Sequence, residues 1–317
     1  MAKTAIAIDL GGTKTAGALV NNSGEMLTKR YKLPTPASEG AGAVIDVIAQ
    51  VIEYEREQLG ADPDAIGIGA AGAIDVTRGV VVNSTGTIAD WVGADIPAQL
   101  RERLPWAAKI PIHVQNDADA HAVGESWKGA GQGASSMLMV AVGTGIGCAF
   151  AIDGHVLRGA HHMAGEIGNA RIPFTDVPFV TDGDKPAQFE QNTAGPALVK
   201  FYKDLDGEQA GAAKGQRVIE LAAEGDEVAV AISRTLGARL GEVVSWYVLM
   251  LDPEVVVLGG GVPQPGSAWW EAMETRLREL LPPALSDVTL RRAKLKNSAA
   301  LLGAARDAFR LAGIKTK

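Results

Sequence analysis

Two stretches of the chain share the same order of a strand, a glycine turn and a second strand. In the first, apolar or β-branched runs at residues 5–9 and 15–20 flank Gly11-Gly12-Thr13-Lys14. In the second, residues 137–142 and 148–152 flank Gly143-Thr144-Gly145-Ile146-Gly147. Each pattern predicts a β-hairpin with a glycine turn. Because the patterns lie 134 residues apart, counted from position 9 to position 143, they indicate a duplicated α/β architecture in which each half offers a turn to a shared cleft.

The rest of the chain alternates helix and strand patterns. Apolar residues recur with the period of an amphipathic helix at Val44, Val47, Ile48, Val51 and Ile52, and Gly60 marks its end. Further helices are expected over residues 118–127, within 216–251 with an interruption at 225–226, and over 298–311. Residues 255–258 predict a buried strand before a third glycine cluster at 259–261. Residues 173–188, rich in proline, aspartate and glycine, predict a long loop.

Composition and charge exclude several classes of protein. Acidic residues outnumber basic ones by 37 to 30, so the chain offers no electrostatic footprint for nucleic acid or for an anionic membrane. Its one cysteine, Cys148, cannot form an internal disulfide or a zinc site of several thiolates. The apolar run before Asp9 is too short for a signal-peptide core. We therefore expect a cytoplasmic protein whose partners are small molecules.

One uncharged run, residues 129–152, is long enough to cross a bilayer. It contains six glycines, and its centre alternates between strand and turn patterns, which a membrane-spanning helix would not do. The run therefore predicts buried sheet.

Glycine turns can bind phosphate because no Cβ keeps their backbone N–H groups away from an anion, and such charge-assisted hydrogen bonds are strong. For any single turn, a plain hairpin is the alternative. The two common nucleotide-binding motifs do not fit. No GxxxxGK[ST] occurs, and residues 143–147 have the spacing GxGxG and lead into a strand, unlike the GxGxxG turn of a dinucleotide-binding fold.

Five motifs together resemble the ordered signature of the ROK family of sugar kinases and repressors. They are Asp9-Leu10-Gly11-Gly12-Thr13-Lys14, Asn116-Asp117 before a helix, Gly143-Thr144-Gly145-Ile146-Gly147, Ala164-Gly165-Glu166-Ile167-Gly168, and Leu251-Asp252-Pro253 leading to Gly259-Gly260-Gly261. The resemblance covers almost the whole chain and implies an α/β, actin-like (hexokinase/ribonuclease H-like) two-domain fold with an interdomain cleft. Residues 1–115 and 299–317 would form a smaller N-terminal α/β domain with the C-terminal helix, and residues 116–298 a larger α/β domain.

The resemblance also implies an ATP-dependent kinase that transfers the γ-phosphoryl of Mg-ATP to the 6-hydroxyl of a hexose or amino hexose. Asp9 would hold Mg²⁺ directly or through water, although it could also accept the Gly11 N–H in an Asx turn. The side chain of Lys14 would point toward a phosphate of the donor, or it would be a solvated lysine of the hairpin. The donor phosphates would lie against Gly11, Gly12, Thr13, Gly143, Thr144 and Gly145, and the adenosine against Gly260 and Gly261.

Asp117 is the candidate catalytic base, because phosphoryl transfer needs one carboxylate to take the hydroxyl proton. By resemblance, Asp117 contacts the primary hydroxyl of the sugar, and Asn116 beside it holds a neighbouring hydroxyl. The alternative is that the two residues only cap the helix that begins at Ala118.

Glu166 and Glu190 would accept hydroxyl groups of the sugar, and the alternative for each is a surface carboxylate. Gly72 would line the remaining wall. Thr85 would do the same, because residues 83–91 look similar to the STxxIxxW stretch of N-acetylmannosamine kinases.

The chain departs from the family pattern at its zinc site. The family usually has His at the end of its GE-x-GH element, followed by a CxCGxxGC cluster. This sequence has Asn169 there and lacks those cysteines. The prediction is a zinc-free kinase with residues 170–190 held by packing, and Asn169 can still hydrogen-bond a sugar hydroxyl. A metal site of His161, His162 and Glu166 is disfavoured, because the glycines at 165 and 168 argue against a helix that would align them.

Three other functions are the alternatives to this kinase. Inorganic polyphosphate could replace ATP as donor, as in some zinc-free relatives. A sugar-responsive repressor would need an N-terminal helix-turn-helix domain, for which Asp9 leaves no room. A sugar-binding regulatory protein without catalysis would have no use for Asp117 and the phosphate turns. The sugar itself stays open among glucose, mannose, N-acetylmannosamine, N-acetylglucosamine and an unusual amino sugar such as kanosamine, and relatives suggest a homo-dimer or tetramer.

Overall fold

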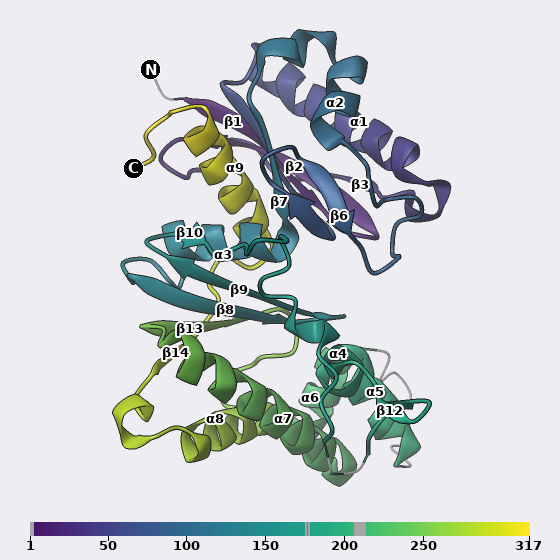
Figure 1. The fold of residues 1–317 in the computed structure, drawn as a ribbon, viewed down its shortest axis with the longest axis vertical. Coiled ribbons are helices and arrows are strands. Elements are labelled where there is room, and N and C mark those ends of the chain that lie inside the picture. Colours follow the sequence, from purple (N-terminus) through teal and green to yellow (C-terminus); the bar gives the residue numbers. More distant parts are fainter. Residues whose placement is uncertain (1–2, 175, 177, 206–213) are drawn as a thin grey trace. The chain divides into compact units, whose positions relative to one another are not determined.

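The computed structural model describes residues 3–174, 176, 178–205 and 214–317. The chain forms two compact units (Figure 1). The first unit contains Met1–Gly133, Ala151–Ala164 and Lys294–Lys317, and the second contains Ala134–Phe150 and Gly165–Ala293. This grouping differs from the expected division into 1–115 plus 299–317 and 116–298, because the helix that follows residue 116 packs closely on the C-terminal helix.

The first unit is built on a five-stranded sheet with the order β3-β2-β1-β4-β7. Its strands are β1 (Thr4–Leu10), β2 (Lys14–Asn21), β3 (Tyr31–Pro34), β4 (Ala65–Ala70) and β7 (Ile112–Asn116). The strands β1 and β2 form the predicted antiparallel hairpin, and β4 and β7 continue the sheet parallel to β1. Short strands β5 (Ala73–Asp75) and β6 (Val80–Asn83) pair beside it, and the short 3-10 helices are Ala37–Glu39, Pro105–Lys109 and Lys296–Ser298.

Alternate residues of β1 enter two different cores. Ile6, Ile8 and Leu10 belong to a cluster with the buried face of α1 (Ala41–Leu59), which ends at Gly60 with φ 68° as the sequence predicted. Residues Ala5 and Ala7 belong to a second cluster with α9 (Ala299–Leu311). Because successive strand residues point to opposite faces, these helices cover the two faces of one sheet.

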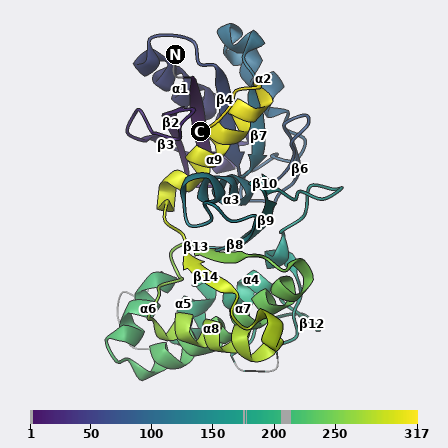
Figure 2. The same ribbon diagram turned by 90° about the vertical axis from the view of Figure 1, so that its left-hand side faces the viewer.

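Helix α3 (Asp117–Lys128) packs closely on α9, and glycines allow the approach (Figure 2). A Cβ at Gly303 would lie 1.8 Å from the carbonyl oxygen of Ala120, and one at Gly124 would lie 2.1 Å from that of Ala299. The remaining elements of this unit are α2 (Ile96–Arg103), which begins at the N-cap Asp95, and β10 (His155–Val156).

The second unit contains the strands β8 (Ser136–Val142), β13 (Val255–Gly259) and β14 (Thr289–Arg292), and β9 (Ile146–Ile152) runs from this unit into the first. The order in this sheet is β10-β9-β8-β13-β14, with β13 parallel to β8 and β14. The second predicted pair of strands around residues 143–147 therefore forms. The uncharged run 129–152 contributes β8 and β9, which confirms the expectation of buried sheet. In the described ranges, no helix has the length and hydropathy to cross a membrane.

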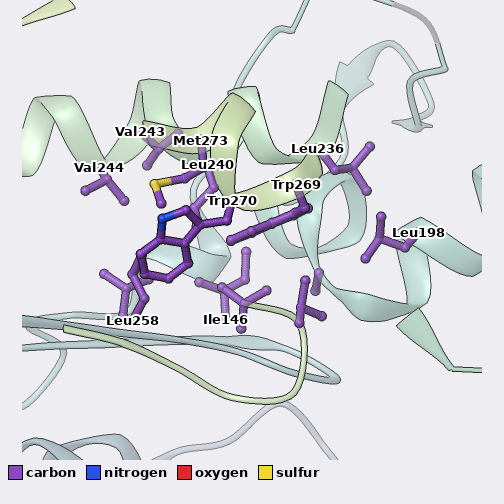
Figure 3. Close-up of a cluster of buried hydrophobic side chains, with 14 of the residues drawn as sticks. Ile146, Leu198, Leu236, Leu240, Val243, Val244, Leu258, Trp269, Trp270 and Met273 are labelled. Carbon is purple, nitrogen blue, oxygen red and sulfur yellow. The ribbon is translucent and has the colours of Figure 1, made fainter. Parts of the chain in front are cut away.

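Helices of the second unit are α4 (Phe189–Thr193), α5 (Gly195–Asp204), α6 (Gly215–Ala223), α7 (Glu227–Leu251) and α8 (Ala268–Leu280). The predicted interruption separates α6 from α7, with Gly225 at φ 96° and Asp226 as the N-cap of α7. Trp269 and Trp270 are buried where α8 packs on α7 (Figure 3). Both therefore pack in the core.

The segment expected as a long loop contains a small hairpin. The strands β11 (Thr181–Asp182) and β12 (Lys185–Pro186) pair, and an isolated bridge joins Arg171 to Gln188. A 3-10 helix at Ile167–Asn169 precedes it, and another lies at Pro283–Leu285. Of the expected loop, residues 175 and 177 lie outside the described residues.

Candidate functional site

Two carboxylates lie at one edge of the first unit's sheet. In the parallel register, Asp9 of β1 is paired with Gly69 of β4, and Gly69 with Gln115 of β7. Asp117 follows Gln115 by two residues and begins α3. Since parallel strands end at the same edge, Asp9 and Asp117 lie at that edge with only β4 between their strands.

Burial dominates the electrostatics of this pair. It raises the pKa of Asp117, the charge of His121 counteracts the rise, and Asp9 adds to it. Burial likewise raises the pKa of Asp9, against the opposing charges of His121 and Arg30. The three groups Asp9, Asp117 and His121 are thus electrostatically linked. His121 did not stand out in the sequence, although its position four residues after Asp117 on the predicted helix could have indicated it.

Asn116 caps α3 and also holds the loop after β4. Its Oδ1 accepts the N–H groups of Ala118 at 2.8 Å and Asp119 at 3.2 Å, and its Nδ2 donates to the carbonyl oxygen of Gly72 at 2.9 Å. The Oδ1 of Asp117 accepts the Ala118 N–H at 2.8 Å. The alternative of a helix cap is therefore present in the structure, and contacts of either residue with a sugar stay predictions.

The Gly11–Thr13 turn is closed by its own hydrogen bonds. The Gly11 N–H donates to the Lys14 carbonyl at 3.0 Å, so it is used by the hairpin and not by an Asx turn at Asp9. The Thr35 hydroxyl donates to the Gly11 carbonyl at 2.8 Å, and the Thr35 N–H to the Thr13 carbonyl at 3.1 Å. Within the described part of the chain, the N–H groups of Gly12 and Thr13 have no protein acceptor. The turn thus presents two free donors, beside the exposed Lys14.

Two glycines bring this turn and its neighbours together. A Cβ at Gly12 would lie 2.3 Å from the Cγ2 of Thr87, whose hydroxyl is 3.0 Å from that of Thr85. Gly72 has φ 98°, and a Cβ there would lie 2.6 Å from the carbonyl oxygen of Asn83. The first unit therefore gathers its predicted site residues at one sheet edge, on strand ends, on the first turn of α3 and on the loops between them. They are Asp9, Gly11, Gly12, Thr13, Lys14, Gly72, Thr85, Asn116 and Asp117.

A cavity of 820 Å³ lies beside the turn in the same unit. It is lined by residues 33–39 and 86–89 in part, including Thr35 and Thr87, which contact the turn. Neither Asp9 nor Asp117 lines it. The cavity is thus a neighbour of the candidate site.

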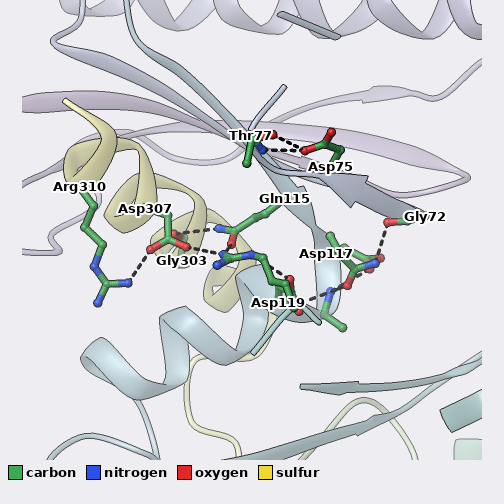
Figure 4. A network of polar contacts seen from close by, with 12 residues as sticks. Gly72, Asp75, Thr77, Gln115, Asp117, Asp119, Gly303, Asp307 and Arg310 are labelled. Atoms are coloured by element: carbon green, nitrogen blue, oxygen red, sulfur yellow. Dashed lines mark hydrogen bonds and ion pairs between the residues drawn. The ribbon is translucent and has the colours of Figure 1, made fainter. Parts of the chain in front are cut away.

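Arg158 holds the residues on both sides of Asp117. Figure 4 shows the polar network around Gln115, Asp119 and Asp307. The Nη2 of Arg158 donates to the Oε1 of Gln115 at 2.8 Å and to Asp307 of α9 at 3.0 Å, and its Nε lies 3.4 Å from Asp119. The ends of the chain segment that carries Asp117 are therefore fixed to α9. No local sequence pattern indicates this network, because it joins residues from three distant parts of the chain.

The Gly143–Gly145 turn of the second unit resembles the first turn in its donors. The Gly143 N–H donates to the Gly145 carbonyl at 2.9 Å, and the Gly143 carbonyl accepts the Gly195 N–H at 2.8 Å, at the start of α5. Among the described residues, the N–H groups of Thr144 and Gly145 have no protein acceptor. This turn also presents two free donors.

The third glycine cluster lies next to this turn. The strands β8 and β13 are parallel and pair Ala141 with Gly259, so they end together. Gly260 has φ 87°, and a Cβ there would lie 2.1 Å from the carbonyl oxygen of Val142. Gly261 has open space around its Cα. The second unit therefore brings Gly260 and Gly261 to the turn at residues 143–145.

Glu190 lies against the same turn, and Glu166 pairs with Asn169. The carboxylate of Glu190 accepts the Ile146 N–H at 3.3 Å, and a Cβ at Gly145 would lie 2.8 Å from its Oε2. The Nδ2 of Asn169 donates to the Oε2 of Glu166 at 3.0 Å. All three side chains are half-buried and hydrogen-bonded, so neither glutamate is a free surface carboxylate.

Gln188 was missed by the sequence analysis. Its Nε2 donates to the Oδ1 of Asn169 at 3.2 Å, which fixes the orientation of the Asn169 amide. The pairing of residues 171 and 188 brings Gln188 there, and no local sequence signal marks that pairing.

Among the described residues, no group of three or more His, Cys, Asp and Glu side chains is placed to hold a metal ion. His162 pairs with Asp75, at 3.6 Å between Nε2 and Oδ1, and Cys148 is buried. Asp9 is different, because Mg²⁺ is bound through one or two carboxylates, with water and substrate phosphates completing its shell.

The comparison with known proteins decides the family. Residues 5–308 match the family model described as ROK family. The chain belongs to the ROK family. This ROK protein is 30% identical to the glucokinase of Streptomyces coelicolor, over 95% of this chain and 96% of that one. It is 30% identical to the N-acetyl-D-glucosamine kinase of Photobacterium profundum, over 80% of this chain and 82% of that one.

A solved structure agrees with these relatives. The ROK protein matches a ROK family glucokinase from Streptomyces griseus in complex with glucose and AMPPNP, with a TM-score of 0.78, 29% identity and coverage of 97% of this chain and 99% of that one. The family and the actin-like α/β fold that the motifs implied are confirmed. The relatives also support a sugar kinase as the class of this ROK protein.

Proposed function

We propose that the protein is an ATP-dependent kinase that phosphorylates the 6-hydroxyl of a hexose or amino hexose. The observation that carries the proposal is the half-buried carboxylate of Asp117, which lies at one sheet edge with Asp9 and beside a turn with free N–H donors. The relatives named glucokinase and N-acetyl-D-glucosamine kinase, and the glucokinase bound to glucose and AMPPNP, support the same substrates.

Asp117 acts as the general base. Burial raises its pKa, which brings the group nearer to the pH at which it works and strengthens it as a proton acceptor. The carboxylate takes the proton of the sugar hydroxyl, and the oxygen of that hydroxyl forms a bond to the γ-phosphorus. The bond from that phosphorus to the β–γ bridging oxygen breaks, and ADP leaves.

The glycine turns bind the donor. The N–H groups of Gly12, Thr13, Thr144 and Gly145 would donate to phosphate oxygens, because nothing in the described chain accepts them. Gly11, Lys14 and Gly143 complete the phosphate-binding turns, and Gly260 and Gly261 would contact the adenosine.

Asp9 would hold Mg²⁺, which when bound neutralises charge on the phosphates. The fit rests on burial, which raises the pKa of Asp9 by penalising its bare negative charge, and a nearby cation offsets that penalty.

Hydrogen-bonding side chains would recognise the sugar. Asn116, Glu166, Asn169 and Glu190 supply amide and carboxylate groups, and hydroxyl groups bind such acceptors and donors well. Gly72 and Thr85 of the first unit would line the sugar site.

An assay of ADP release from Mg-ATP against hexoses and amino hexoses tests the proposal. We expect turnover of one sugar, a loss of about 10²- to 10⁴-fold in Asp117→Asn, and no change in the control Asp62→Asn, which alters an exposed aspartate of the same unit. Turnover only with inorganic polyphosphate would replace ATP as donor. Sugar binding without turnover on either donor would contradict the kinase and leave a regulatory protein.

Addition of a zinc chelator to one set of assays tests the zinc-free prediction, with unchanged turnover as the expected result. We also propose that the protein is a homo-dimer or tetramer and that it is cytoplasmic. Sedimentation equilibrium would measure the oligomeric state.

A further inference from the structure

Arg239 is a buried charged residue in the middle of α7, with only 3% of its side chain exposed. All of its nitrogen atoms contact one segment of the chain. The Nε donates to the carboxylate of Asp176 at 2.9 and 3.2 Å, the Nη1 donates to the carbonyl oxygen of Asn192 at 2.7 Å, and the Nη2 donates to that of Pro178. A buried guanidinium is costly unless its donors are used in this way.

Aromatic rings enclose the same guanidinium. Its carbon lies 5.0 Å from the ring centroid of Phe174, 5.6 Å from that of Phe201 and 6.0 Å from that of Phe179. Phe174 also packs against Phe179 and against Phe189, the first residue of α4. Cation–π contacts and the charged hydrogen bonds therefore hold the same segment from several sides.

The held segment leads directly to predicted sugar ligands. The side chain of Asn192 is buried in α4, where its Oδ1 accepts the Val180 N–H at 2.8 Å and its Nδ2 donates to the Val180 carbonyl at 3.2 Å. Glu190 lies on the same short helix. Gln188, just before that helix, holds Asn169.

We propose that Arg239 is a positioning residue that fixes Asp176, Pro178 and Asn192, and through α4 orients Glu190 and Asn169 for the sugar. A buried charge would thus hold this part of the chain, whereas the resemblance implies that zinc holds it in members of the family that have the zinc site. The sugar part of this inference rests on the proposed function. The clamp itself, defined as Arg239 with Asp176, Pro178 and Asn192, does not.

The main test substitutes Arg239→Met, which keeps most of the side-chain length and removes every donor. Arg276→Met is the matched control, because Arg276 lines the same 490 Å³ cavity as Arg239 but is 38% exposed and pairs with Glu242. Hydrogen exchange is read at the Val180 amide, which the clamp protects, and at Val257 in the middle of β13, which reports the rest of the unit. Steady-state assays give KM and kcat for sugar and for ATP.

We expect exchange at Val180 to rise about tenfold or more in Arg239→Met, since charged hydrogen bonds of this kind are lost, with exchange at Val257 unchanged. The KM for the sugar should rise about tenfold while the KM for ATP and kcat stay within about threefold. Arg239→Lys keeps the charge but not the planar fork, so it should recover part of the sugar KM. Arg276→Met should match the unsubstituted protein.

Unchanged exchange at Val180 would overturn the clamp. Increased exchange with an unchanged sugar KM would overturn the positioning role and leave Arg239 as a stabilising residue. If Val257 also exchanges faster, the unit has unfolded, and Asp176→Asn then carries the test, because it alters a 41% exposed partner and keeps both carbonyl contacts. A chain that phosphorylates no sugar would refute the proposed function, while exchange at Val180 would still decide the clamp.

Discussion

The side-chain amide of Asn116 donates to the carbonyl oxygen of Gly72 at 2.9 Å while its own oxygen accepts the N–H of Ala118. One side chain thus joins the loop after β4 to the first turn of α3, on which Asp117 lies. Gly72 has φ 98°, a conformation that glycine adopts readily and other residues rarely adopt. The carbonyl is therefore held in a backbone conformation that would be strained in any other residue.

Asn116→Ala removes both halves of this link. We expect a loss of about 1–2 kcal/mol in the free energy of unfolding, from the lost helix cap and the unpaired Gly72 carbonyl. Asn116→Asp keeps the cap but sets a carboxylate against that carbonyl. Expressed as free energies, its effect on kcat should therefore exceed its effect on unfolding. Urea denaturation and the kinase assay check the two effects. Asn22→Ala removes a comparable bond, from the Asn22 amide to the carbonyl oxygen of Lys315. Equal losses of unfolding free energy and of kcat in both alanine variants would refute the special role of Asn116.

The raised pKa of Asp117 predicts that its charge opposes folding at neutral pH. In the unfolded chain this carboxyl titrates near 3.8, and in the folded chain it titrates higher. Between these values the folded state binds a proton that the unfolded state does not, so stability falls as pH rises through that window. Asp117→Asn should therefore raise the free energy of unfolding at pH 7, because it removes the charge that burial penalises, while it abolishes most turnover.

Denaturation curves of the Asp117→Asn variant and the unsubstituted protein, measured from pH 4 to 8, check this sign. The difference between them should shrink as the pH falls. A variant that is less stable at pH 7 would show that the carboxylate contributes to folding.

The sequence was sufficient for the local features of this site. Both glycine hairpins, the helix cap at Asn116 and the helix break at Gly225 follow from turn chemistry and periodicity, which act over a few residues. The ordered motifs were sufficient to predict the family, because their order and spacing along the whole chain depend on the fold.

The sequence was not sufficient for contacts that the topology creates. His121 influences Asp9 only because β1, β4 and β7 are neighbours in one sheet. Arg158 and Arg239 each bind groups more than 40 residues away, and a lone arginine in a helical or loop pattern looks like a solvated residue. Gln188 gains its role from an isolated bridge that no periodic pattern marks.

The charge of His121 predicts the position of the acidic limb of activity. The limb of kcat/KM follows the pKa of Asp117 in the free enzyme, because only the ionised carboxylate accepts the hydroxyl proton. His121 lowers the pKa values of Asp117 and Asp9, so His121→Gln should move the limb to higher pH. The exposed His155→Gln is the control and should leave the profile in place. A shift toward lower pH would refute the electrostatic link.

Neighbouring glycines of the third cluster should respond in opposite ways to the same methyl group. A Cβ at Gly260 would lie 2.1 Å from the carbonyl oxygen of Val142, which is backbone and cannot rotate away, and its φ of 87° adds strain. A Cβ at Gly261 meets nothing within 4 Å. Gly260→Ala should therefore destabilise the fold by at least about 2 kcal/mol, and Gly261→Ala by less than about 0.5 kcal/mol.

Thermal and urea unfolding of both variants measure these changes, and they separate packing from binding. If Gly261 contacts adenosine, Gly261→Ala should raise the KM for ATP with little loss of stability and no change in the KM for sugar. An unaltered KM for ATP in a stable Gly261→Ala variant would remove Gly261 from the proposed nucleotide site. Equal stability of the two variants would show that the backbone at Gly260 can move away from Val142, and with it the end of β13.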